Sequence, residues 1–493
     1  MERQNGVAEP KKNERFMRKA KKEVIYTDVE IIDAVSEGMA LARVENKVVF
    51  VPFVVPGDVV DIRILKSKKN YAEGKAIAIK YYSDRRVPAQ CPHFGVCGGC
   101  KWQTFNYPDQ LKCKQNQVAS NLERIGKIDV SAMSPICGSE RIFHYRNKLE
   151  FTFSNRRWMT PEEISNPDFK PQPNALGLHI PGLYDKVLDI QYCALQDDLS
   201  NDIRNRIREY ASQQGLEFYD IRTHEGFLRN LVIRNTQEGE WMLIVIVAKV
   251  DKSLLFPLLD FVKAEFPQIT SLQYIINEKL NDSYNDLDVV SYHGSPYITE
   301  IMPAYHTGDT PLKFRISPKS FYQTNSQQAR NLYGFVADFA DLHGSETVYD
   351  LYTGTGTIAC FVAKYCKKVV GIEYVEDAVA DARVNAELNG FDNTTFFAGD
   401  MADILTHDFI AQHGTPDIVI TDPPRAGMHE KVVNQLLATL PQKIVYVSCN
   451  PATQARDVSM LSEKYAVKAI QPVDMFPHTQ HVENVMLLER RDS

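Results

Sequence analysis

The sequence contains no long hydrophobic run. The longest strongly apolar stretch, Trp241 to Ala248, is far shorter than the roughly 20 residues that a membrane-spanning helix needs. Residues 1–24 are mostly polar and charged, unlike the apolar centre of a secretory signal peptide. We therefore expect a cytoplasmic protein that makes no contact with a membrane.

Positive charge is not in excess, because 56 Lys and Arg stand against 63 Asp and Glu, with a formal net charge of −7. This balance argues against a protein that coats nucleic acid over its whole surface, so any RNA contact must be confined to local basic patches. The nine cysteines are an odd number without a regular framework. They predict free thiols and metal ligands rather than disulfides.

The length of 493 residues is too great for one ordinary domain. We expect a multidomain chain that begins with a disordered basic tail over residues 1–23, which would add either loose phosphate affinity or only solubility. The other expected parts are a small β-barrel over 24–83, an α+β middle domain over 84–310 and a catalytic α/β domain over 311–493.

Residues 24–83 alternate short β-type runs with turns, and about five strands in so short a segment predict a small closed barrel. The order Ser36-Glu-Gly-Met-Ala-Leu-Ala-Arg43, followed by Val54-Val-Pro-Gly-Asp58, resembles a TRAM domain. The resemblance implies an OB-like module that binds RNA. Lys66, Lys68 and Lys69 would then form a phosphate-binding edge, although a solvated face has the same pattern.

Three cysteines lie close together in Cys91-Pro-His-Phe-Gly-Val-Cys97-Gly-Gly-Cys100. The glycines let the backbone curl so that its N–H groups can point at bound sulfide, which is typical of an iron–sulfur site. A cluster needs a fourth thiolate, and the spacing leaves Cys113, Cys137 and Cys193 as candidates. Zinc, with His93 as a ligand, is an alternative, but the second Cys-x-x-Cys half of a usual zinc site is missing.

A basic amphipathic helix is expected over residues 107–125, carrying Lys112, Lys114 and Arg124. After it, cations alternate with aromatic residues from Arg141 to Trp158. Single-stranded RNA is bound by such a combination, with cations on phosphates and rings stacked on bases. A half-buried pair of strands has the same alternation, so both interpretations stay open.

From Phe314 the chain alternates strand and helix patterns to its end. A first helix is expected to begin with Asn325 as its cap and Gln328 three residues on, and to end at Gly344. Strands are expected over 347–352, 368–373, 395–398, 417–421, 443–447, 467–473 and 483–488. The pattern predicts a doubly wound, Rossmann-like sheet with an antiparallel last pair.

The first turn of this sheet is the glycine-rich Asp350-Leu-Tyr-Thr-Gly354-Thr-Gly356-Thr-Ile-Ala359. It allows a ligand to approach closely, and Glu373 at the end of the next strand can accept both hydroxyls of a ribose. NAD and S-adenosylmethionine fit this pattern equally. A loop across the switch point, Asp422-Pro-Pro-Arg-Ala-Gly427, favours a methyltransferase, because nucleotide methyltransferases present the base there and a dehydrogenase has no evident use for it.

Cys449 lies in Ser448-Cys-Asn-Pro451, where a buried strand stops because Pro451 cannot continue the ladder. Ligands bind at such a strand end in an open sheet, although a lone buried cysteine is often inert. A thiolate that adds to C6 of a pyrimidine makes C5 able to accept a methyl group. Glu483 could then remove the C5 proton, with His478 and His481 as alternative bases.

Arg425 in the Asp422 loop bears on which atom is methylated. Exocyclic-amine methyltransferases have an aromatic residue at this position, and RNA cytosine-C5 enzymes carry an additional cysteine in this loop. Uracil C5 is therefore favoured as the methyl acceptor.

The order of these motifs, with Gln323-Thr-Asn before the glycine turn and Asp474-Met-Phe-Pro-His-Thr-Gln-His-Val-Glu483 at the end, resembles the bacterial 23S ribosomal RNA (uracil-5-)-methyltransferases over nearly the whole chain. The resemblance implies a class I S-adenosylmethionine-dependent enzyme with a TRAM domain and a 4Fe–4S cluster. It implies cluster ligands Cys91, Cys97, Cys100 and Cys193, cofactor-binding residues Gln323, Tyr352, Glu373, Asp400 and Asp422, nucleophile Cys449 and base Glu483.

The relatives that modify tRNA usually lack the barrel and the cluster, so the resemblance favours 23S rRNA as the substrate. Methylation of tRNA is the first alternative. A non-catalytic RNA-binding iron–sulfur protein is an alternative of another class. We expect the protein to act as a monomer.

Overall fold

The computed structural model describes residues 23–170 and 172–492, so the predicted basic tail lies almost wholly outside the described residues. The chain divides into two compact units, a small one that ends at Asp84 and a large one that comprises the short segment Ala34–Met39 and the chain from Arg85 on. Within the described residues, no helix is both long enough and apolar enough to cross a membrane.

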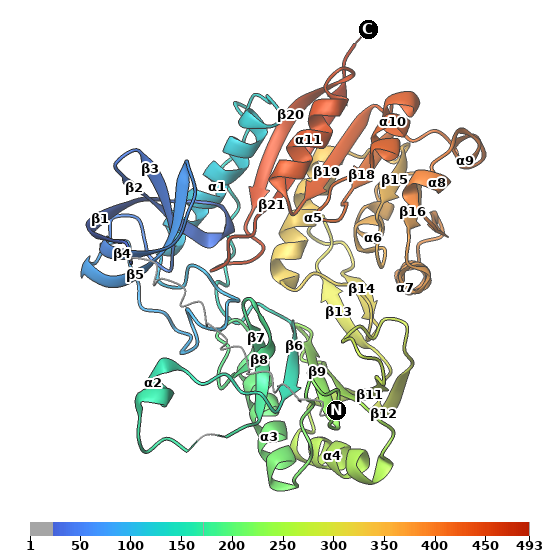
Figure 1. Ribbon diagram of the computed structural model, residues 1–493. Helices are drawn as coiled ribbons and strands as arrows, with labels where there is room; N and C mark the ends of the chain where they lie inside the picture. The colour runs from blue at the N-terminus through green and yellow to red at the C-terminus, as the bar shows by residue number, and fades with distance from the viewer. Residues whose placement is uncertain (1–22, 171, 493) are drawn as a thin grey trace, which may run out of the picture. The chain divides into compact units, whose positions relative to one another are not determined.

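The small unit is a closed barrel with the strand order β1-β2-β3-β5-β4 (Figure 1). Its strands are β1 (Ile25–Ala34), β2 (Met39–Val44), β3 (Lys47–Pro52), β4 (Val59–Ser67) and β5 (Tyr71–Tyr81). Within the barrel, β5 pairs in parallel with β3 and antiparallel with β4. Alternate side chains such as Val49, Val51 and Ile62 are fully buried inside it, as the period of a strand requires. The predicted barrel is confirmed.

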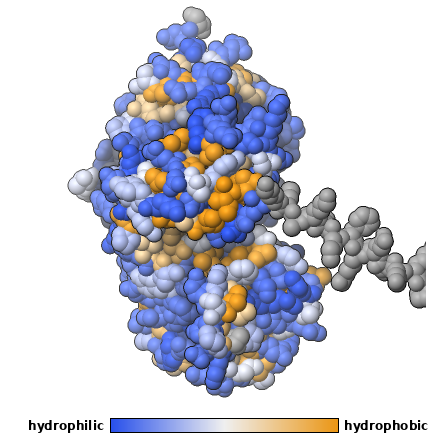
Figure 2. All heavy atoms as spheres, turned by 60° about the vertical axis from the view of Figure 1, so that its left-hand side comes forward, coloured by the Kyte–Doolittle hydropathy of each residue, from blue (hydrophilic) through white to orange (hydrophobic). Residues whose placement is uncertain are grey.

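The surface of the small unit combines cations with apolar side chains. Leu65, Tyr81 and Tyr82 are each more than half exposed, and Lys66 lies 3.1 Å from Glu73 on the neighbouring strand. One face of the whole molecule is drawn in Figure 2, where hydrophobic patches interrupt a mostly hydrophilic surface. Exposed rings beside lysines are typical of surfaces that bind single-stranded nucleic acid.

The first half of the large unit is built on a sheet with the order β12-β11-β10-β9-β6-β7-β8. Its strands are β6 (Lys148–Ser154), β7 (Ala175–Ile180), β8 (Leu183–Asp189), β9 (Leu228–Asn235), β10 (Trp241–Val247), β11 (Ile269–Ile276) and β12 (Val289–Gly294). Helices α3 (Asp198–Gln213) and α4 (Lys252–Glu265) share one core with this sheet. Every residue of β10 is buried, which explains its uninterrupted apolar run.

The second half is an α/β sheet with the order β17-β16-β15-β18-β19-β21-β20 (Figure 1). Its strands are β15 (Thr347–Leu351), β16 (Lys368–Glu373), β17 (Thr394–Ala398), β18 (Ile418–Thr421), β19 (Lys443–Ser448), β20 (Tyr465–Val473) and β21 (Glu483–Arg490). Strands β15 to β19 pair in parallel, and β21 runs antiparallel to both β19 and β20. The predicted doubly wound sheet with an antiparallel last pair is confirmed.

Helices connect these strands. They are α6 (Thr357–Ala363), α7 (Glu376–Leu388), α8 (Met401–Ile404), α9 (His407–His413), α10 (Glu430–Thr439) and α11 (Pro451–Leu461), and α5 (Ser326–Ala340) precedes the first strand. Earlier in the chain lie α1 (Tyr107–Arg124), the short α2 (Pro161–Ser165) and the hairpin of β13 (Ile298–Met302) and β14 (Leu312–Ile316). Helix α1 lies beside α11 and β20 (Figure 1), although α1 ends at Arg124 and α11 begins only at Pro451.

The end of α5 differs from the prediction. Asn325 caps the helix as expected, accepting a hydrogen bond from the backbone N–H of Gln328. The helix stops at Ala340, before Gly344, because Asp341 takes a left-handed conformation with φ 52° and ends the ladder there. The Gln328 side chain donates to the carbonyl of Cys137 instead of closing a capping box.

Candidate active site

The turn between β15 and α6 has an unusual backbone. Tyr352, Gly354 and Gly356 all have positive φ, at 63°, 55° and 75°. A Cβ at Gly356 would lie 2.9 Å from Ala382 Cβ, whereas no heavy atom lies within 4 Å of a Cβ built on Gly354. The turn is therefore packed on one side and open at Gly354, as a turn that receives a ligand must be.

Glu373 at the end of β16 holds this turn from the side. Its Oε2 accepts the N–H of Gly354 at 3.0 Å, and its Oε1 accepts the N–H of Val375 at 3.0 Å. Behind the turn, Asp350 is fully buried, and its Oδ1 has no hydrogen-bond partner among the described residues. Burial raises the pKa of Asp350 to about 7.

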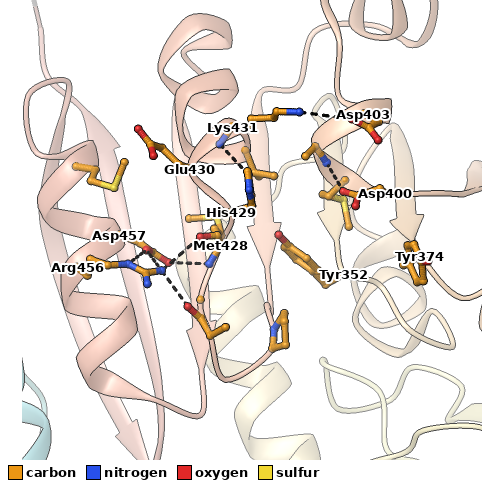
Figure 3. Close-up of a pocket in the computed structure, with 17 residues that line it drawn as sticks. Tyr352, Tyr374, Asp400, Asp403, Met428, His429, Glu430, Lys431, Arg456 and Asp457 are labelled. Atoms are coloured by element: carbon orange, nitrogen blue, oxygen red, sulfur yellow. Dashed lines mark hydrogen bonds and ion pairs between the residues drawn. The ribbon is translucent and has the colours of Figure 1, made fainter.

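A cavity of 750 Å³ opens beside the turn, a size suited to a cofactor. Figure 3 shows Tyr352 between the Arg456–Asp457 pair on one side and Asp400 and Tyr374 on the other. Asp400 caps α8 by accepting the N–H of Ala402 at 2.9 Å. Of the expected cofactor-binding residues, Tyr352 and Asp400 line this cavity, and Gln323, Glu373 and Asp422 lie outside its lining.

The loop from Asp422 to Gly427 is held by the helix that follows the Cys449 loop. The side-chain amide of Asn450 donates to the Arg425 carbonyl at 3.0 Å, and the Thr453 hydroxyl lies 3.2 Å from the same oxygen and 3.1 Å from the Asn450 carbonyl. Two loops from neighbouring parallel strands are thus joined at one carbonyl. Cys449, the residue before Asn450, therefore lies close to the Asp422 loop.

Asp457 on α11 fixes the far end of the same loop. Its buried carboxylate accepts the N–H of Met428 at 2.8 Å and the hydroxyl of Tyr446 at 2.7 Å. The Arg456 guanidinium pairs with Asp457 and also donates to the Ala426 carbonyl at 3.0 Å (Figure 3). The loop backbone is therefore determined by side chains of α11 that carried no recognisable motif in the sequence.

Cys449 and Glu483 meet through the register of β19 and β21. Ser448 lies directly opposite Asn484 in this antiparallel pair. Cys449 follows Ser448 and Glu483 precedes Asn484, so the thiol and the carboxyl group lie at the same edge of the sheet. Asp422 leaves the sheet one strand away, because β18 pairs with β19.

Burial and neighbouring negative charges disfavour ionisation of the acidic groups at this edge. Burial raises the pKa of Cys449 to about 11, with a further contribution from the charges of Glu483 and Asp422. Burial and the charge of Asp350 raise the pKa of Asp422 to about 7. Burial and Asp422 raise the pKa of Glu483 well above its ordinary value. The cation of Arg425 opposes the increase at both Cys449 and Glu483.

The segment before Glu483 is tied to α1. Lys114 Nζ lies 2.6 Å from Asp474 Oδ1 and 3.0 Å from the Phe476 carbonyl. The Tyr107 hydroxyl donates to Asp474 Oδ2 at 2.9 Å. The sequence predicted Lys114 as a surface cation of an amphipathic helix, but the side chain is fully buried. Its spacing from Val118 on the same helix stripe was the available signal.

His478 belongs to the scaffold of the site. Its backbone is left-handed with φ 66°, and its carbonyl accepts the N–H groups of Lys101 and Trp102 at 2.9 and 3.1 Å. Its ring stacks on Phe143 at 4.2 Å. Burial lowers the pKa of His478 and of His481 to about 4, so both rings are neutral at pH 7.

The four cysteines expected to hold a cluster are gathered in one region. Cys100 and Cys193 share a small apolar cluster with Phe94 and Phe476. Burial raises the pKa of Cys100 to about 12, and the charges of Cys97, Cys193 and Cys91 add to the increase. Gln103 donates to Cys100 Sγ at 3.2 Å, and the N–H of Gly99 donates to Cys97 Sγ at 3.4 Å.

Soft thiol donors with N–H groups aimed at sulfur fit an iron–sulfur group chemically. Within residues 23–170 and 172–492, however, no group of three His, Cys, Asp or Glu residues is arranged to hold a metal ion. The zinc alternative finds less support, because His93 Nε2 accepts the N–H of Gln191 at 2.9 Å. The iron–sulfur interpretation stays a prediction.

The sheet order, the open glycine turn with its acidic residue and the neighbouring cavity define a class I methyltransferase fold. Residues 294–491 match the family model described as tRNA (uracil-5-)-methyltransferase, and residues 21–77 match the TRAM domain. An uncharacterized RNA methyltransferase of Bacteroides thetaiotaomicron is 55% identical over 92% of this chain and 100% of that protein. One of Chlorobaculum tepidum is 41% identical over 89% and 90%.

Among solved structures, the tRNA (uracil-54, C5)-methyltransferase of Pyrococcus abyssi in complex with S-adenosyl-L-homocysteine matches with a TM-score of 0.70 and 28% identity. The match covers 93% of this chain and 100% of that chain. The chain belongs to the RNA (uracil-5-)-methyltransferase family and is an S-adenosylmethionine-dependent enzyme.

Proposed function

We propose that the protein methylates C5 of a uridine in RNA through a covalent adduct between Cys449 Sγ and C6 of the base. The register of β19 and β21 carries this proposal, because it brings a thiol and a carboxyl group to one edge of the sheet. A thiol nucleophile and a base for the C5 proton are the two groups that the reaction requires.

Each residue then has a defined role. The Cys449 thiolate adds to C6, C5 takes the methyl group, Glu483 removes the C5 proton, and the thiolate leaves with the electrons of its bond to C6. Gln323, Tyr352, Glu373, Asp400 and Asp422 would hold S-adenosylmethionine, which would supply the methyl group and leave as S-adenosylhomocysteine. Arg425 assists because its charge lowers the pKa of both Cys449 and Glu483, which favours the reactive thiolate and carboxylate.

Ribosomal RNA of the 23S type is the first candidate substrate, on the basis of the order of barrel, cysteine motif and catalytic motifs. Transfer RNA is the second, since the matching structure from Pyrococcus abyssi is a tRNA enzyme and the match spans 93% of this chain. S-adenosylmethionine labelled in its methyl group, incubated with each purified RNA, separates the two.

Nuclease digestion and mass spectrometry of the labelled RNA should give 5-methyluridine. Label in 23S rRNA alone supports the first candidate, and label in tRNA alone supports the second. A label on cytidine, or on an exocyclic amine, contradicts the proposed chemistry.

We further propose that Cys91, Cys97, Cys100 and Cys193 hold a 4Fe–4S cluster. The shared cluster of Cys100 and Cys193 supports this, together with the N–H groups that point at Cys97 and Cys100. Iron and sulfide analysis of protein purified without oxygen should give four of each per chain, as the composition of such a cluster requires. Zinc without sulfide would contradict the proposal. Cys193→Ser should lower both contents, whereas Cys366→Ser, outside the group, should not.

A further inference from the structure

A second cavity of 270 Å³ lies where four segments of the large unit meet. One wall is the segment that contains Arg141, Arg146 and Asn147, and the others are the start of α3, the connection between β9 and β10, and the start of α5. Cofactor-binding residues expected from the sequence do not line it. Its size suits a single nucleotide rather than a whole cofactor.

Two residues that line this cavity donate hydrogen bonds to segments that carry proposed cofactor-binding and catalytic residues. The Asn147 side-chain amide donates to the Gln323 carbonyl at 3.0 Å and to the Ser326 hydroxyl at 2.9 Å. The Tyr145 hydroxyl donates to the Pro477 carbonyl at 3.0 Å, within the segment that leads to Glu483. A ligand in this cavity would therefore contact residues that are bonded to the segments carrying Gln323 and Glu483.

The cavity offers cations for a phosphate. Arg141 is exposed, and Arg146 is half-buried with its Nε fixed by the Lys148 carbonyl at 3.1 Å. Asp197 also lines the cavity, but its carboxylate accepts the N–H of Leu199 at 2.9 Å as the cap of α3, where the helix end offsets its charge. Paired arginines are typical phosphate ligands in RNA contacts.

The side chain of Asn147 offers a hydrogen-bond acceptor for the nucleoside part of a ligand. The Asn147 side chain is only 6% exposed, and its Oδ1 has no hydrogen-bond partner among the described residues. A buried carbonyl oxygen without a donor costs free energy, and an N–H or O–H group of a ligand would remove that cost. A base N–H and a ribose 2′-hydroxyl are the donors that RNA carries.

We propose that this cavity binds the RNA nucleotide beside the target uridine, with its phosphate on Arg141 and Arg146 and a donor of its nucleoside on Asn147 Oδ1. The inference rests on the proposed function, since it takes RNA as the substrate. It assigns part of the substrate specificity to the middle of the chain, outside the methyltransferase sheet.

Binding tests this directly and does not require turnover. In a Cys449→Ala background, the dissociation constant of an in vitro 23S rRNA or tRNA transcript is measured at several salt concentrations. Arg141→Ala and Arg146→Gln should each weaken binding on the order of tenfold and reduce the slope of log K against log salt by about one. Lys263→Ala, an exposed cation on α4, is the matched control and should change neither.

Asn147→Ala and Ser326→Ala separate recognition from packing. Both variants lose the bond between the two side chains, whereas Asn147→Ala also removes the unused acceptor and the bond to the Gln323 carbonyl. We expect a KM for RNA raised severalfold, with little change in kcat, for Asn147→Ala alone. Equal effects of the two variants, or arginine variants that bind RNA as the control does, would overturn the inference. A wild type that binds the transcripts but methylates neither would contradict the proposed function instead.

Discussion

The ammonium group of Lys114 lies 2.6 Å from Oδ1 of Asp474, and neither side chain has any exposed surface. With the Tyr107 hydroxyl on Oδ2, the carboxylate is fully paired. This buried ion pair joins α1 to the segment that precedes Glu483. The position of the proposed base thus depends on a partner 360 residues away in the chain.

Breaking this pair should destabilise the fold and slow the reaction. Lys114→Ala leaves an uncompensated buried carboxylate, which costs about 3–5 kcal/mol of unfolding free energy. Urea unfolding followed by circular dichroism measures this cost. Arg206→Ala, which removes an exposed pair with Glu265, should cost no more than about 1 kcal/mol. Equal costs for the two variants would contradict the role given to Lys114.

The hydrogen-bonded contact between the Cys449 and Asp422 loops, at the Arg425 carbonyl, can be tested at Thr453. Thr453→Val removes the hydroxyl, which is within hydrogen-bond distance of both the Arg425 and the Asn450 carbonyls, and keeps the shape of the side chain. The loss of a hydrogen bond of about 1 kcal/mol that fixes the reacting groups predicts a kcat about fivefold lower. Thr453→Ser keeps the donor and should retain activity. Rate measurements with saturating RNA and cofactor compare the two, and a Ser variant as slow as the Val variant would argue against this contact.

The charges around Cys449 predict how its reactivity changes with pH. Because the pKa of the thiol is raised to about 11, its alkylation by iodoacetamide should rise about tenfold per pH unit between pH 7 and 10. Glu483→Gln removes a charge that raises the pKa, so alkylation at a given pH should be faster. Arg425→Ala removes a charge that lowers it, so alkylation should be slower. Mass spectrometry of the Cys449 peptide gives the rates, and the reverse order would refute this electrostatic account.

Glu300 on β13 should make stability depend on pH. It is fully buried, its Oε2 has no partner among the described residues, and burial raises its pKa to about 7. The folded state therefore holds a proton that the unfolded chain releases above its ordinary pKa of about 4.5. Stability from this group is complete below about pH 4.5, is lost as pH rises towards 7, and stays lost above it.

Glu300→Gln removes this dependence because the amide does not titrate, and it can still accept from Gln237. The unfolding free energy of the variant should increasingly exceed that of the wild type between pH 5 and 7. Above pH 7 the difference should be about 3 kcal/mol. Unfolding by urea at several pH values measures the difference. A difference that does not change with pH would contradict the assignment.

The local patterns of this sequence predict its helices and strands well, but they do not predict contacts between residues that are remote in the chain. The strands around Gly354 and Cys449 follow from apolar runs that end at glycine or proline. The apposition of Cys449 and Glu483 depends on a register between β19 and β21, which no local pattern specifies. Lys114 looks like an exposed cation because its partner, Asp474, is remote in the chain. The shared acceptor at Arg425 depends on backbone geometry that exists only in the folded protein.

The covalent route through Cys449 is tested most directly by trapping its intermediate. Glu483→Gln, incubated with labelled RNA and S-adenosylmethionine, should accumulate a protein–RNA adduct that survives denaturing electrophoresis, because the C5 proton cannot be removed. Peptide mapping should place the RNA on Cys449, and the double variant with Cys449→Ala should form no adduct. Rapid release of methylated RNA by Glu483→Gln, without any adduct, would contradict the mechanism.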